Sequence, residues 1–239
     1  MSLEMLPDRA GREVDFEPML DELLAIFCPE WELPPIMEGE HQYHRNEVKR
    51  YQLGEAAAQD PAATRQHASL LMHAAMHDQC RSGIRQLIQP LATACGYRQI
   101  KAAIIDYMRT GSDPEKVGAG MAWYFARPGL QYASMEDLRR GIPTEESKAA
   151  LEGLADLRNE YRSACLSAFL ACEDPEARQD LSLNLSLDPA DYPADLRSSH
   201  EGKAHHPGRP RTVSLAAGTL HTHATVGIGP TRSIDESHA

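Results

Sequence analysis

A short turn sequence occurs twice in the chain and constrains its fold more than any other feature. Asp113-Pro114-Glu115 and Asp174-Pro175-Glu176 each follow an apolar segment and a polar turn, 61 positions apart (113 to 174). Aspartate accepts hydrogen bonds from the free amides at a helix start, and proline fits the first helical position because no N–H is needed there. Glutamate in the first turn complements the positive end of the helix. Each copy therefore predicts a helix, a tight turn opened by the aspartate, and a second helix.

Apolar residues at helical spacing predict further helices along the chain. Tyr51 and Tyr124 are among the expected inner positions, and Gly118 and Gly120 are expected to allow close helix packing. Strand signals are thin, because no alternating apolar run occurs before residue 212. The sequence thus predicts an all-α protein. Besides the helices that follow the two turns, the predicted helical segments are 15–31, 45–60, 61–76, 84–95, 97–109 and a long one from 144 to about 170.

The chain divides into three parts. With 239 residues, 42% of them hydrophobic, it is long enough for one domain with its own core. Residues 1–44 form an acidic helix and linker, 45–200 the helical domain, and 201–239 a His/Gly/Thr-rich tail expected to be disordered and flexible. The acidic helix either caps the helical domain or docks on another protein.

Helix pairs of this kind bury one face against each other and leave another for neighbouring pairs, which is how α-solenoids are built. The second turn, Asp174-Pro175-Glu176-Ala177-Arg178, resembles the turn of the HEAT-repeat family; in the first turn the apolar residue, Val117, comes one place later. Segments 111–125 and 186–193 also resemble HEAT-like proteins of actinobacteria. The resemblance covers residues 61–199. It implies a curved helical scaffold that binds another macromolecule, and it does not imply chemistry. We therefore expect a short right-handed HEAT-like array over 45–200 that binds another protein without catalysis or a cofactor.

The same resemblance implies where a partner would bind. In HEAT-like arrays the second helices of the pairs line the concave surface, and aromatic residues and arginine dominate interface energetics. In a competing interpretation, Trp123 and Tyr124 do not bind a partner but cover the apolar end of a short array. The candidate partner-binding residues are Arg85, Gln89, Trp123, Tyr124, Arg127, Arg178 and Gln179.

Two histidines offer an alternative function. His73 and His77 lie one helical turn apart and could share a metal with Cys80, which would suit a metal-dependent enzyme. The metalloprotease motif is absent, because Ala74 stands where that motif has its glutamate. The alternative without a metal is that the two histidines simply lie on one face of a helix. Tail histidines at 205, 206, 221 and 223 could bind metal only adventitiously, since ordering a flexible segment opposes a specific site.

Charge and cysteine content disfavour several other functions. The net charge is −11, of which residues 1–44 contribute −9 from two basic and eleven acidic residues. An acidic chain without a basic run is a poor candidate for nucleic acid or anionic membranes. Five cysteines without a C-x-x-C pair suit the reducing cytoplasm. No nucleophile, phosphate-loop or dinucleotide motif occurs, so we expect no enzymatic activity.

Overall fold

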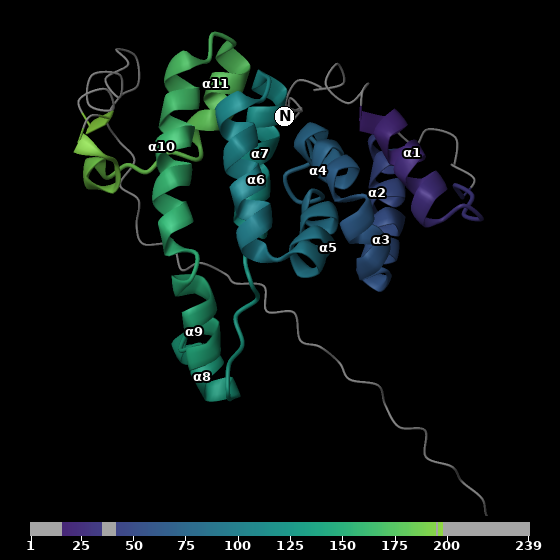
Figure 1. Ribbon diagram of the computed structural model, residues 1–239, viewed down its shortest axis with the longest axis horizontal. Coiled ribbons are helices and arrows are strands. Elements are labelled where there is room, and N and C mark those ends of the chain that lie inside the picture. Colours follow the sequence, from purple (N-terminus) through teal and green to yellow (C-terminus); the bar gives the residue numbers. More distant parts are fainter. Residues whose placement is uncertain (1–15, 35–41, 195, 198–239) are drawn as a thin grey trace, which may run out of the picture. The chain divides into compact units, whose positions relative to one another are not determined.

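The computed structural model describes residues 16–34, 42–194 and 196–197 (Figure 1). Within these ranges the chain forms α-helices and one 3-10 helix, and no strand. The predicted all-α class is therefore confirmed, whereas the predicted tail, 201–239, lies outside the described residues. The helices are α1 (Phe16–Phe27), α2 (Gln42–Gln59), α3 (Pro61–Gln66), α4 (Ala68–His77), α5 (Arg85–Cys95), α6 (Tyr97–Thr110), α7 (Asp113–Phe125), α8 (Met135–Arg140), α9 (Glu145–Glu152), α10 (Ala155–Ala171), α11 (Pro175–Ser182) and the 3-10 helix η2 (Pro189–Asp191).

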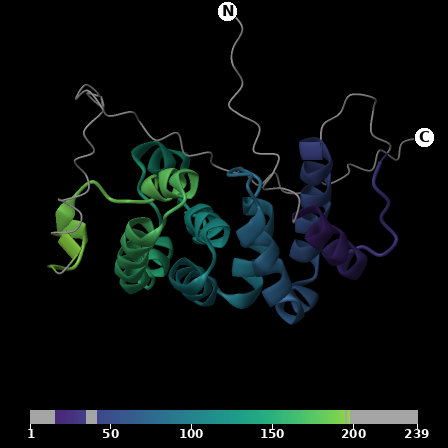
Figure 2. The ribbon, with the colours of Figure 1, turned by 90° about the horizontal axis from the view of Figure 1, so that it is seen from above.

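The main helices pack in two rows (Figure 2). One row is formed by α2, α5, α6 and α10, and the other by α1, α4, α7 and α11; each helix contacts its neighbours in its own row. Across the rows, α1 packs on α2, α4 on α5, α6 on α7 and α10 on α11. The core lies between the rows and is continuous from α1 to α11.

The order in which the chain enters the two rows reverses halfway. The pairs α1/α2 and α4/α5 begin in the second row, whereas α6/α7 and α10/α11 begin in the first. A tight turn at Gly96 joins α5 to α6 within one row, and its positive φ of 94° is a conformation that glycine adopts without strain. An array of equivalent repeats would keep one order throughout. The order is thus shared within each half, and α6/α7 and α10/α11 are the two pairs that carry the predicted turns.

The two predicted turns differ in their capping residue. Asp174 caps α11 as predicted, accepting a hydrogen bond from the Glu176 amide with Pro175 at the first helical position. The prediction that Asp113 caps α7 is wrong, because Ser112 occupies the cap and pairs with Glu115 in a capping box. Serine one place earlier is itself a favoured cap, so α7 begins one residue sooner.

Two predicted helices are interrupted, and two predicted inner residues face outward. The segment 61–76 is divided at His67, and the helix from 144 is divided after Glu152. Tyr51 and Tyr124 are 58% and 57% exposed, so their predicted inner positions are wrong. In α2 both Leu53 and Arg50 are buried, and the apolar pattern did not indicate the burial of Arg50.

Arg50 is buried because it forms an ion pair inside the core. Its Nε lies 2.7 Å from Oδ2 of Asp78, and Nη2 donates to Oδ1 at 2.9 Å. The Asp78 Oδ1 also accepts from the Cys80 amide at 2.9 Å. The guanidinium lies 5.3 Å from the centre of the Phe16 ring. This buried pair therefore joins α1, α2 and the segment that follows α4.

The other predicted features can be compared directly with the structure. The segment between α7 and α9 contains one short helix, α8. All five cysteines are free. Among the described helices, none combines the length and apolar character needed to cross a membrane.

Candidate functional site

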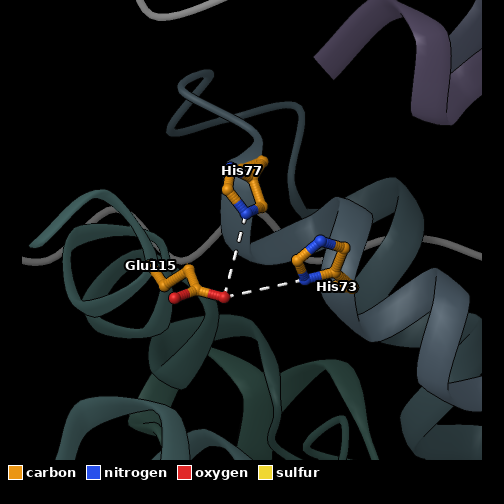
Figure 3. A group of neighbouring side chains, drawn as sticks. All are labelled: His73, His77 and Glu115. Carbon is orange, nitrogen blue, oxygen red and sulfur yellow. Dashed lines mark ion pairs between the residues drawn. The ribbon is translucent and has the colours of Figure 1, made fainter. Parts of the chain in front are cut away.

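Two helices bring three potential metal ligands together (Figure 3). His73 and His77 lie one turn apart on α4, with ring centroids separated by 4.7 Å, and Glu115 comes from the first turn of α7. The helices approach closely at Gly118, where a Cβ atom would lie only 1.9 Å from the carbonyl oxygen of Met76. The expected role of Gly118 in close packing is therefore confirmed.

The three side chains surround a gap rather than bonding directly to one another. Glu115 Oε1 lies 3.6 Å from His73 Nδ1 and 3.8 Å from His77 Nε2. One ligand atom from each residue lies within 4.8 Å of the other two. Both measured separations exceed those of ordinary hydrogen bonds. Two imidazole nitrogens and a carboxylate oxygen around such a gap could bind a small cation or a water molecule.

Glu115 is held in place by the cap of α7. Its Oε2 accepts hydrogen bonds from the amide and the hydroxyl of Ser112, at 2.7 and 2.8 Å. Burial opposes ionisation, but the Ser112 hydrogen bonds and the imidazoles of His77 and His73 favour the ionised form more strongly. The pKa of Glu115 therefore lies below its usual value. The carboxylate offers its second oxygen, Oε1, to the two imidazoles.

The cluster borders a hollow of about 450 Å³ beside α1. Pro18, Met19 and Glu22 of α1 line it together with the cluster. His73 is 45% exposed, whereas the side chains of His77 and Glu115 are 20% and 18% exposed. A ligand can therefore reach the cluster from the side of His73.

The third member of this group differs from the sequence-based hypothesis. Within the described part of the chain, Glu115 completes the only group of three ligand-type residues, and Cys80 is not part of it. The buried Cys80 thiol instead accepts from the Gly83 amide at 3.2 Å and lies 3.6 Å from the Ser82 hydroxyl. Sequence reasoning missed Glu115 because only the packing of α7 on α4 brings it to the histidines.

The predicted partner-binding residues are distributed over both rows. Arg85 and Gln89 lie on α5, in the first row. The others lie on α7, just after it, or on α11, in the second row. The structure therefore does not bring all seven residues to one helix row. This second group comprises Trp123, Tyr124, Arg127, Arg178 and Gln179.

Trp123 is engaged inside the molecule. Its ring stacks on Tyr161 of α10 with a centroid distance of 4.0 Å, and the ammonium of Lys101 lies 3.3 Å from its ring centre. Burial, with a smaller contribution from the guanidinium groups of Arg158 and Arg127, lowers the pKa of Lys101 to about 7. Trp123 thus links α6, α7 and α10 through contacts within the chain.

Three other predicted residues also have internal contacts. Arg127 lies over the ring of Tyr124 at 4.4 Å and donates to its hydroxyl at 3.1 Å. Arg178 donates from Nε to the carbonyl of Cys172 at 2.8 Å and so braces the turn before α11. Tyr124 stays largely exposed despite its contact with Arg127.

Arg85 and Gln89 line a groove between α2 and α5 of about 340 Å³. Both are exposed, and within the described part of the chain neither side chain forms a hydrogen bond or an ion pair. The opposite wall includes the exposed Tyr51 and Glu55, and Pro61 lies at the edge of the groove. This groove combines an aromatic ring, an exposed guanidinium and apolar surface.

Comparison of the chain with known protein families, with curated proteins and with solved structures found no match. The resemblance to HEAT repeats therefore stays a prediction that depends on the two turn sequences.

Proposed function

We propose that this protein is a non-catalytic scaffold that binds another protein, and that the groove between α2 and α5 receives part of the partner. The groove is the observation that supports this proposal, because it contains two exposed candidate residues, Arg85 and Gln89, whose side chains form no hydrogen bond or ion pair with any described residue. Tyrosine and arginine in a recess are the residue types that contribute most to protein interfaces.

The chemistry of the groove indicates the kind of segment it would bind. Arg85 presents a guanidinium that can form a bidentate pair with a carboxylate. The exposed ring of Tyr51, together with the exposed Pro61, offers apolar surface for a neighbouring side chain. The partner segment in this proposal therefore carries an acidic residue next to an apolar one.

The stacked pairs α6/α7 and α10/α11 support a HEAT-like origin for the scaffold. Their shared row order and the Asp-Pro-Glu sequence at each turn are those expected of two adjacent repeats. In this proposal the HEAT-like array is limited to these pairs, and α1 to α5 form a differently ordered extension that carries the groove.

A photo-crosslinking amino acid at position 89 tests the groove in cells that produce the protein. We expect discrete adducts with a partner, and we expect Arg85→Glu to reduce them at least tenfold by reversing the charge. The same crosslinker at the exposed Arg139 of α8 is the matched control. Equal adducts from both positions, no adduct from position 89, or insensitivity to Arg85→Glu would each refute the proposed site.

A further inference from the structure

We propose that His73, His77 and Glu115 bind a single divalent transition-metal ion of the zinc class. Two imidazole nitrogens and one carboxylate oxygen are the ligand types that zinc takes in three-ligand protein sites. All three atoms lie within 4.8 Å of one another around a gap. This proposal does not depend on the partner-binding groove, which lies between α2 and α5.

The measured separations are close to those of a metal site. Zinc bonds of about 2.0–2.1 Å at tetrahedral angles place neighbouring ligand atoms roughly 3.3 Å apart. Glu115 Oε1 lies 3.6 and 3.8 Å from the two imidazole nitrogens. Small side-chain rotations of His73 and His77 would bring both nitrogens to bonding distance.

The carboxylate is already oriented by its surroundings. The two hydrogen bonds from Ser112 hold Oε2, which leaves Oε1 directed toward the histidines. Partners that fix a ligand in this way strengthen metal sites, because less ordering is needed on binding. The close approach of α4 and α7 at Gly118 fixes the separation of the two helices that supply the ligands.

The coordination sphere has room for a further ligand. The cluster borders the hollow beside α1, which Glu22 also lines. Three protein ligands and one position open to a water molecule are typical of accessible zinc sites. Such an ion would join α4 to α7 and would remain reachable by small molecules.

Zinc binding by the full-length, untagged chain tests the proposal. The tail histidines could bind zinc by themselves, so the measurements use a background in which His205, His206, His221 and His223 are changed to Gln. In this background we expect one zinc ion per chain by isothermal titration. Cobalt in place of zinc should give the visible absorption of a four-coordinate ion with nitrogen and oxygen ligands.

Two variants and one control separate the site from general effects of charge. Glu115→Gln keeps a residue that serves in a capping box but removes the anionic ligand, and His77→Gln removes an imidazole. Each should weaken zinc binding at least tenfold, whereas Glu146→Gln, in the exposed first turn of α9, should leave it unchanged. Circular dichroism melts verify that each variant is folded.

The outcomes are decisive in either direction. Stoichiometric zinc that survives the tail changes and is lost in Glu115→Gln supports the site. Binding that disappears with the tail histidines, or that is indifferent to both Glu115→Gln and His77→Gln in folded protein, would overturn it.

Discussion

The close contact of α4 with α7 makes Gly118→Ala a sensitive test of the packing that forms the candidate metal site. The added Cβ would lie 1.9 Å from the Met76 carbonyl oxygen and 2.6 Å from its carbonyl carbon. Both are backbone atoms within a helix, so neither can turn aside as the end of a side chain would. The helices would have to separate by about 1 Å, in a protein interior packed as densely as an organic crystal.

The expected loss of stability combines two opposing contributions. Alanine favours an α-helix over glycine by about 1 kcal/mol. Overpacking costs typically about 1–3 kcal/mol and more where backbone must move. Because the clash here is with backbone, we expect overpacking to exceed the helix gain and the variant to lose about 2 kcal/mol of unfolding free energy.

Urea unfolding followed by circular dichroism measures this loss. A change of about 2 kcal/mol would lower the transition midpoint by roughly 1 M at the slopes usual for domains of this kind. Gly153→Ala is the matched control, because its Cβ would meet only ordinary contacts at 3.4 Å in a right-handed helical conformation. A Gly118→Ala variant as stable as wild type, or as stable as Gly153→Ala, would refute the close packing of α4 on α7.

Three further predictions concern buried charge, helix caps and pH. Asp78→Ala leaves the Arg50 guanidinium buried without its carboxylate and should cost about 3–5 kcal/mol of unfolding free energy in urea titrations; a loss below about 1 kcal/mol would contradict the buried pair. Asp174→Ala removes the α11 cap and should lower the unfolding free energy by about 1 kcal/mol, whereas Asp113→Ala should cost clearly less, and equal losses would contradict the assigned caps. The unfolded chain holds the Lys101 proton up to its usual pKa of 10.5, whereas the folded chain releases it near 7. Stability should therefore rise with pH across that interval relative to Lys101→Met, with a slope approaching about 1.4 kcal/mol per pH unit, and parallel pH profiles for the two proteins would contradict the buried amine.

Local sequence signals predicted the helices because their physical causes are local. Asp174-Pro175 identifies the start of α11 from capping chemistry alone. At α7 the same reasoning placed the cap one residue too late, because Ser112 competes with Asp113 for that position. Spacing could not distinguish these two starts, since both residues are good caps.

The spacing of apolar residues could not predict features that depend on tertiary packing. Tyr51 was expected inside α2, but the Arg50–Asp78 pair occupies the buried side with a charge that no hydrophobic count includes. The reversal of row order depends on how the Gly96 turn directs α6, which local propensity does not specify. The two turn sequences therefore did not indicate the reversal, and the HEAT-like array stays a prediction.

The sequence predicted two of the three residues of the candidate metal site, His73 and His77, but not Glu115. His73 and His77 share a helix face, so their four-residue spacing was sufficient to suggest a pair of ligands. The sequence alone predicts for Glu115 only that it complements the start of the helix. Its carboxylate reaches the histidines because α7 packs on α4, and that contact is set by Gly118 and the core around it.

Anomalous diffraction at the zinc absorption edge, from crystals of the full-length protein grown with zinc, tests the central claim most directly. We predict one strong peak between α4 and α7, with bonds of about 2.0–2.2 Å to His73, His77 and Glu115. Zinc found elsewhere with this gap empty, or α4 and α7 separated so that Glu115 no longer faces the histidines, would contradict it.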